Sequence, residues 1–157
     1  MLYSMIKKIS LFCLLIIFVN NCGYTPIYSN KDKNFVINKI ELVGDNEVNK
    51  ILSSRLNIYK NNTGAERIFD IIISSKSTKT TLTKDKKGNP SQFSQNVSVN
   101  LIITNTINQT NVETSFTESS TYDNSDNKFD LKKYENNLIK NMSEKIYSDL
   151  ILFIQTK

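Results

Sequence analysis

Few side chains in this sequence are suited to catalysis or to metal binding. There is no histidine and there are only two cysteines, so the usual general bases, nucleophiles and soft-metal ligands are largely missing. Carboxylate pairs such as Asp123 with Asp126, or Asp32 near Glu41, lie in polar or turn-forming stretches, where solvated charge is the ordinary role. The four glycines are spread singly and form no phosphate-binding loop. We therefore expect a protein that is not an enzyme and that needs no cofactor or metal ion.

Cys22 is the side chain whose position indicates a specific chemistry. It closely follows the apolar run Ile9 to Val19, which comes directly after Lys7 and Lys8, and this order is typical of an export signal. The run is too short to span a bilayer, which takes about 20 residues, so cleavage is favoured over a permanent transmembrane anchor. Because Cys13 lies inside the run, Cys22 is the only thiol of the exported product, and no intramolecular disulfide can form.

The residues around Cys22 indicate that it carries lipid. The segment Val19-Asn20-Asn21-Cys22 resembles the lipobox of bacterial lipoproteins, although Asn20 and Asn21 stand where small residues are usual. Acyl chains on Cys22 would hold the protein at a membrane, since each buried methylene contributes about 0.8 kcal/mol. The alternative is a secreted protein with a free thiol. We expect residues 1–21 to be a lipoprotein signal peptide, 22–34 a lipidated tether and 35–157 a single domain.

The net charge gives little support for a nucleic-acid partner. Removal of Lys7 and Lys8 with the signal peptide lowers the formal charge from +5 to +3. Lysine supplies nearly all of the positive charge and occurs with abundant asparagine and isoleucine, a composition that an AT-rich genome produces by itself. No arginine-rich run or series of stacking aromatics accompanies the lysines, so we expect no nucleic-acid binding.

Hydrophobic periodicity predicts an α+β fold with the element order β-α-β-β-β-α. Strands are expected where β-branched and apolar residues alternate, and the first helix where apolar residues recur every three or four positions. The expected strands cover 35–42, 67–83, 93–103 and 112–122, and the helix covers 45–60 after a break and N-cap at 44–46. The second strand is polar from Ser74 onward, and the lysine, glycine and proline of 84–90 predict a hairpin loop.

The clearest pattern predicts a long amphipathic helix at the C-terminus. Asp126 or Asp130 is expected to cap its start. Its polar face is mixed in sign, which favours packing against the sheet over lying on a membrane. Together, the expected strands and helices predict a two-layer sandwich, in which two helices cover a four-stranded, mostly antiparallel sheet. The apolar residues of the terminal helix that step by four are Tyr134, Leu138, Met142, Ile146, Leu150 and Ile154.

Two stretches resemble the LPS-assembly lipoprotein family, known as LptE or rare lipoprotein B, in its divergent alphaproteobacterial form. Cys22 to Tyr28, Cys-Gly-Tyr-Thr-Pro-Ile-Tyr, is similar to the Cys-Gly-aromatic-x-Pro-Leu-Tyr opening of these proteins. The second stretch is Ser119 to Asp126 with Phe129, running into the terminal helix. The expected order of strands and helices also agrees, so the resemblance spans nearly all of the exported chain.

The resemblance implies a non-catalytic partner of LptD, the large outer-membrane β-barrel that translocates lipopolysaccharide (LPS). Such a partner is a plug in the barrel lumen that helps to deliver LPS to the outer leaflet. A palmitate-type lipid anchor on the periplasmic side of the outer membrane is implied too, and the absence of aspartate after Cys22 agrees with that membrane. The anchor and a small α+β domain also fit an accessory lipoprotein of another lipid-transport or barrel-assembly machine, or a cell-wall-binding or cell-wall-cutting domain.

Three lysines in the expected hairpin loop are candidate contacts for LPS phosphates. Lys84, Lys86 and Lys87 surround one turn, and ammonium groups bind phosphate through charge-assisted hydrogen bonds. The plainer interpretation is a solvated loop whose charges bind no ligand. We keep both interpretations open at this point.

Overall fold

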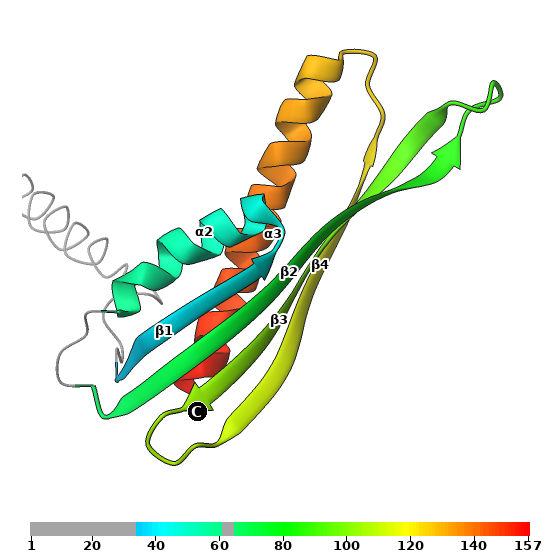
Figure 1. The fold of residues 1–157 in the computed structure, drawn as a ribbon. Coiled ribbons are helices and arrows are strands. Elements are labelled where there is room, and N and C mark those ends of the chain that lie inside the picture. Colours follow the sequence, from blue (N-terminus) through cyan, green and yellow to red (C-terminus); the bar gives the residue numbers. More distant parts are fainter. Residues whose placement is uncertain (1–33, 61–64) are drawn as a thin grey trace, which may run out of the picture. The chain divides into compact units, whose positions relative to one another are not determined.

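The computed structural model describes residues 34–60 and 65–157. The expected signal peptide, Cys22 and nearly all of the expected tether lie outside the described residues, as does 61–64, where the first helix is expected to end. The described elements, labelled in Figure 1, are β1 (Phe35–Gly44), α2 (Asn46–Leu56), a 3-10 turn (Asn57–Tyr59), β2 (Arg67–Lys84), β3 (Pro90–Asn105), β4 (Asn111–Asp123) and α3 (Lys128–Gln155).

The four strands form one sheet in the order β1-β2-β3-β4. β1 and β2 are parallel, because the chain crosses over through α2 between them, and the two other pairs are antiparallel. Both helices lie on the same face of the sheet (Figure 1), with α2 against β1 and β2 and α3 against β3 and β4. The predicted α+β sandwich, its element order and its mostly antiparallel sheet are confirmed.

One face of the sheet supplies the core. Every second residue of β3 points toward the helices and is buried, and β2 contributes Phe69, Ile71 and Ile73 in the same way. Each fully buried aliphatic or aromatic side chain contributes about 1.5 to 3 kcal/mol through the area it removes from water. The buried residues of β3 are Phe93, Gln95, Val97, Val99, Leu101 and Ile103.

The opposite face of the sheet is open and polar along most of its length. In the strand register, four neighbouring rows across β2, β3 and β4 carry serine, threonine or asparagine at every position but one, which is Lys76. The strands remain extended there because the threonines are β-branched and because the inward face is packed. The rows are Ser74-Asn100-Ser115, Lys76-Ser98-Thr117, Thr78-Asn96-Ser119 and Thr80-Ser94-Thr121.

The helix starts are fixed by side-chain caps. The Asp45 carboxylate accepts the backbone N–H groups of Glu47 and Val48, both at 3.0 Å, as the break at 44–46 predicts. For α3 the prediction of Asp126 or Asp130 is wrong, because the cap is Asn127, whose Oδ1 accepts from the N–H groups of Phe129 and Asp130. Asn and Asp cap equally well, so composition alone does not choose among these neighbouring positions.

The C-terminal end of α3 is tied to the first residue of β2. The Arg67 guanidinium donates to the backbone oxygen of Gln155 at 3.1 Å, so the hairpin between β2 and β3 lies at the other end of these long strands. Midway along, Arg55 of α2 and Glu144 of α3 form a bidentate pair with a shortest distance of 2.7 Å. Within the described ranges no helix combines the length and the apolar character needed to cross a membrane.

Candidate functional site

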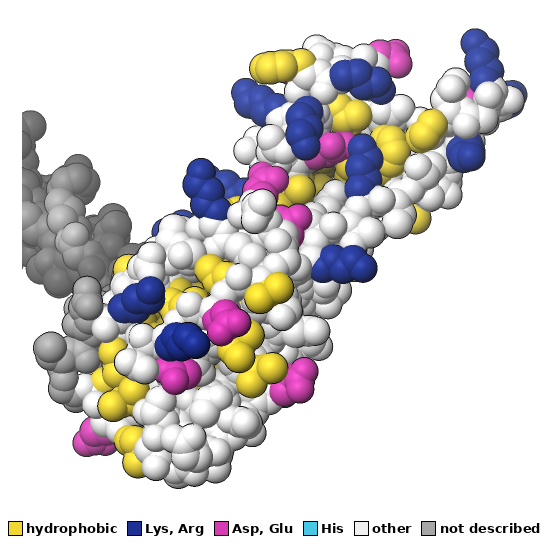
Figure 2. Space-filling model, in the orientation of Figure 1, with side chains coloured by type: hydrophobic (Ala, Val, Ile, Leu, Met, Phe, Trp, Pro, Cys, Tyr) yellow, Lys and Arg dark blue, Asp and Glu magenta, His cyan; other side chains and the backbone are white. Residues whose placement is uncertain are grey.

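The predicted phosphate-binding lysines lie together at the tip of the β2–β3 hairpin. Lys84 is the last residue of β2, and Lys86 and Lys87 form the turn that follows. All three are exposed, and none forms an ion pair with another described residue. Figure 2 shows basic side chains at this tip and, across from it, near the start of α3. The structure therefore brings these three residues into one free cationic group.

Asp85 holds the shape of that turn. Its Oδ1 accepts the backbone N–H groups of Lys87 and Asn89, each at 2.8 Å, and Gly88 adopts a positive φ of 86°. The N–H of Asn89 is the main cause of the lowered pKa of Asp85, with smaller contributions from its side chain and from the N–H groups of Lys87 and Gly88. Asp85 is thus ionised at neutral pH and cancels one of the three positive charges at the tip.

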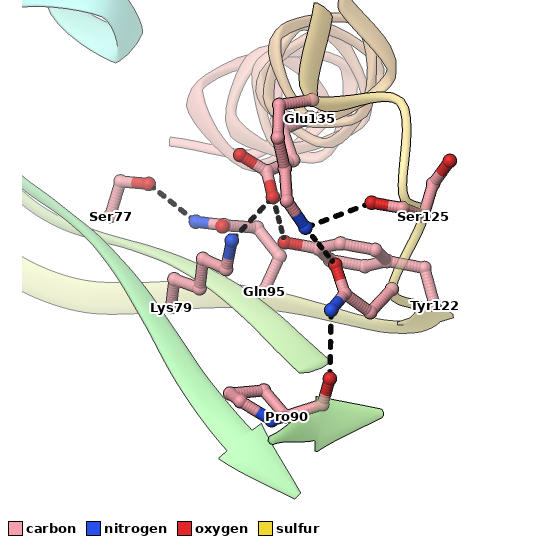
Figure 3. Close-up of polar contacts among 9 residues, drawn as sticks. Ser77, Lys79, Pro90, Gln95, Tyr122, Ser125 and Glu135 are labelled. Atoms are coloured by element: carbon pink, nitrogen blue, oxygen red, sulfur yellow. Dashed lines mark hydrogen bonds and ion pairs between the residues drawn. The ribbon is translucent and has the colours of Figure 1, made fainter. Parts of the chain in front are cut away.

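An internal ion pair lies between the hairpin and α3 (Figure 3). Lys79 of β2 donates to Glu135 Oε1 at 2.5 Å, and the Tyr122 hydroxyl of β4 donates to the same oxygen at 2.9 Å. The ammonium group of Lys79 also lies 3.8 Å from the centre of the Phe93 ring, a cation–π contact. Glu135 of α3 is buried, so side chains of β2 and β4 meet at its carboxylate, and β3 contributes the Phe93 ring beside Lys79.

Neighbouring polar groups extend this network along the hairpin. Gln95, which is buried on β3, donates to the Ser77 hydroxyl at 2.7 Å. Nearer the tip, Asn124 donates to the backbone oxygen of Pro90 at 2.8 Å, and Lys128 donates to Asn124 Oδ1 at 3.1 Å (Figure 3). These bonds add polar contacts to the small apolar cluster of Phe93, Tyr122 and Leu131, which packs the hairpin against the start of α3.

The pKa of Glu135 reflects two opposing effects. Burial raises the pKa of the carboxyl, and the hydrogen bonds from Lys79 and Tyr122 lower it. The lowering is the larger effect, so the pKa lies below its ordinary value of 4.5. A carboxyl with a lowered folded pKa stabilises the fold above its unfolded pKa, and this stabilisation is lost as pH falls through the folded value. Burial and the bond to Glu135 raise the pKa of Tyr122, which therefore stays protonated and remains a donor.

We expect Glu135→Gln to lower the free energy of unfolding at pH 7 by about 1 kcal/mol, because Lys79 loses its counter-charge while remaining partly solvated. The variant should also lose part of the acid sensitivity of the protein below pH 4.5. Urea unfolding of the full chain between pH 3 and pH 7 measures both effects, with the exposed Glu66→Gln as the control. Equal acid sensitivity in the two variants would contradict the assigned role of Glu135.

Sequence reasoning missed this network, although the pattern contains a signal for it. Ser75, Ser77 and Lys79 continue the parity of the buried isoleucines of β2, so Lys79 falls on the inward face. On α3, Glu135 follows Leu131 by four residues and occupies the buried position, whereas its neighbour Tyr134, predicted as part of the apolar stripe, is 49% exposed. A lysine and a glutamate on facing inward positions together predict an internal pair.

The hairpin end is suited to binding an anion. In the part of the chain that the structure describes, no group of three or more His, Cys, Asp or Glu residues is placed to hold a metal ion. The hairpin tip carries the ammonium groups of three lysines on a turn that Asp85 holds in shape, and such groups bind anions such as phosphate.

This chain resembles known proteins in its fold. No protein-family model matches the sequence, and no curated protein matches it either. Among solved structures, rare lipoprotein B from Shewanella oneidensis aligns with a TM-score of 0.50 at 10% identity, over 74% of this chain and 96% of that one. Lipoprotein B from Nitrosomonas europaea has the same TM-score at 11% identity, over 77% and 84%.

A third solved structure, a lipoprotein from Caulobacter crescentus CB15, aligns with a TM-score of 0.50 at 15% identity, over 74% of this chain and 88% of that one. At such identities a likeness establishes the fold, and it leaves the activity and partners of this chain to be argued from its own residues. The shared fold extends over 84% to 96% of each of these structures.

Proposed function

We propose that this protein is a non-catalytic outer-membrane lipoprotein of the LptE (rare lipoprotein B) type, anchored by lipid on Cys22 on the periplasmic side. In this role it is the plug and accessory subunit of the LPS-translocating β-barrel LptD. The observation that carries the proposal is the fold, which matches rare lipoprotein B over 96% of that chain. The motif from Cys22 to Tyr28 supports it independently, because it comes from sequence rather than from architecture.

The open sheet face supports a place inside a polar barrel. The lumen of a large outer-membrane barrel is wet and lined by polar side chains, whereas its outer surface faces lipid. The serine, threonine and asparagine side chains of this face can form hydrogen bonds with such a wall, and Lys76 is the one charged side chain in the four rows. This face would be costly to bury in lipid, because its hydroxyl and amide groups would find no hydrogen-bond partners there.

The test is mild detergent extraction of the tagged native protein from its own envelope, followed by identification of what co-purifies. We expect one large β-barrel in equimolar amount. A barrel-assembly or lipid-transport complex in its place would favour the other accessory role, and retained peptidoglycan would favour cell-wall binding. Either of these results, without LptD, would overturn the proposal. An unrelated lipoprotein with the same tag is the control for non-specific recovery.

Within this proposal, the lysines at the hairpin tip are candidate contacts for LPS phosphates. Replacing Lys84, Lys86 and Lys87 together by alanine should weaken LPS binding by about tenfold at low salt, since each ammonium contributes a charge-assisted contact that water screens. Binding to immobilised LPS is measured for the full chain at two salt concentrations.

A matched control removes the same charge elsewhere. Lys39, Lys50 and Lys60 are exposed on β1, on α2 and just after α2, away from the hairpin tip. Their triple alanine variant has the same net charge as the hairpin variant and should bind LPS almost normally. If both variants lose the same affinity, the attraction is a general effect of net charge and the hairpin has no specific role.

A further inference from the structure

A second candidate site lies where β4 ends and α3 begins. A concavity of about 530 Å³ opens there to solvent. Two tyrosines, two aspartates, a threonine, a serine and Leu131 line it, and none of these residues belongs to the group of lysines at the hairpin tip. The polar and aromatic residues of the wall are Tyr122, Tyr134, Asp123, Asp130, Thr121 and Ser125.

We propose that this concavity binds one neutral sugar unit of an envelope glycan. A hexose has a face of C–H groups, which packs on an aromatic ring, and a rim of hydroxyl groups, which need hydrogen-bond acceptors. Tyr134 offers a ring that is half exposed, and its centre lies 5.5 Å from that of Tyr122. Tyr122 is itself fixed, because its hydroxyl donates to Glu135 (Figure 3) and its ring contacts that of Phe93, so the ring beside Tyr134 is held in place.

The carboxylates decide the class of ligand. Among the described residues, Asp123 and Asp130 form no ion pair with a lysine or arginine. Asp123 accepts one bond from Gln92 at 3.3 Å, and Asp130 Oδ2 accepts one from Asn127 at 2.6 Å, so each keeps acceptor capacity. Two free carboxylates repel phosphate but form short, charge-assisted bonds with sugar hydroxyls. The concavity therefore selects uncharged sugars over phosphorylated groups.

The surroundings allow the ligand to be longer than one unit. Thr121 belongs both to the wall of the concavity and to the row Thr80-Ser94-Thr121 of the open sheet face. That face continues through further rows of hydroxyl and amide groups, each of which can donate to and accept from a glycan. A sugar chain seated at Tyr134 can thus extend from Thr121 along the hydroxyl groups of Ser119, Thr117 and Ser115 on β4.

The inference does not depend on the proposed barrel partnership, because it rests on the wall of the concavity alone. Two glycans of a bacterial envelope have this chemistry, the sugars of LPS and those of peptidoglycan. The test therefore uses two probes: phosphate-free core oligosaccharide released from LPS, and soluble peptidoglycan disaccharide. The full lipidated chain is held in dodecylphosphocholine, a detergent without a sugar headgroup.

Saturation-transfer NMR then measures contact between protein aromatic protons and sugar C–H protons. We expect transfer to one of the probes, and the probe that responds identifies the source. Tyr134→Ala should reduce the transfer about tenfold, which corresponds to the loss of the stacking ring. Asp130→Asn should weaken binding as well, whereas Asp149→Asn, on the same helix but away from the concavity, should leave it unchanged.

Two results would overturn the inference. One is the absence of transfer to both probes, and the other is transfer that Tyr134→Ala leaves intact. Because Tyr134 is half exposed, its replacement is expected to leave the fold unchanged, and a circular dichroism melt of each variant checks this. Failure of the sugar test would leave the co-purification of a barrel untouched, so the two proposals fail independently.

Discussion

Gly44→Ala is expected to lower the free energy of unfolding by about 3 kcal/mol or more. Gly44 ends β1 with a φ of 105°, which side chains rarely tolerate, and its Cα faces β2 directly. A Cβ placed there would lie 1.9 Å from the backbone oxygen of Ser75 and 2.9 Å from its carbonyl carbon. Since both atoms belong to the backbone of a central strand, no side-chain rotation relieves the clash.

The clash would also disturb the start of α2. The N–H of Asp45 donates to the same Ser75 oxygen at 3.1 Å, and the Asp45 carboxylate caps the helix. Moving β1 away from β2 therefore weakens the strand pair and the cap together. Urea unfolding of the full chain, followed by far-ultraviolet circular dichroism, measures the loss.

Gly88→Ala is the matched control for this prediction. Gly88 also has a positive φ, 86°, but nothing lies within 4 Å of a Cβ built on it. Its replacement by alanine introduces the backbone strain of a positive φ without the clash, and this strain costs about 1 kcal/mol. Comparable losses in the two variants would show that the close approach of Gly44 to Ser75 adds nothing to the strain.

The strands and helices could be predicted because one periodic face of each is buried. β3 is the clearest case, since the apolar residues that alternate in 93–103, namely Phe93, Val97, Val99, Leu101 and Ile103, are all buried, and Gln95 is the one polar residue on the same face. β1 alternates less regularly, and the structure gives the reason. A register shift between Ile37 and Lys39 moves the inward parity from Phe35 and Ile37 to Ile40 and Leu42.

Other features depend on contacts that periodicity does not contain. The choice of Asn127 as the cap of α3 depends on where the chain leaves β4, and several neighbouring residues have equivalent chemistry. The inner position of Glu135 depends on Lys79, which is 56 residues away in sequence. In the sequence, a charged residue on an apolar stripe looks like a break in the hydrophobic pattern, because its partner on the facing element is not yet known.

The concavity at Tyr134 was invisible for the same reason. Its wall combines the end of a strand, a connection and two turns of a helix, and each of these segments alone shows ordinary polar residues. By contrast, the lysines at the hairpin tip lie within four residues of sequence, so a local pattern was enough to find them. A local sequence pattern therefore predicted the lysine group at the hairpin tip, whereas the concavity at Tyr134 can be recognised only in the folded structure.

Cys22→Ala is the prediction with the largest expected effect on the proposed function. Without the thiol no diacylglyceryl group can be attached, and the domain loses every acyl chain that would hold it at the membrane. Each buried methylene contributes about 0.8 kcal/mol, so several chains bind effectively permanently, whereas the unmodified chain has no comparable affinity. We expect the variant to move from the membrane fraction to the soluble or unprocessed fraction, measured by fractionation and by the mass of the natural product.

Cys13→Ala is the control, because it removes the other thiol of the sequence from inside the apolar run and leaves Cys22 in place. This variant should remain processed and membrane-bound. An unmodified Cys22 in the natural product would remove the anchor from the proposal, although the fold would be unaffected. Loss of LptD co-purification in Cys22→Ala alone would further show that anchoring concentrates the domain at its barrel, since confinement to one membrane raises the effective concentration of both partners.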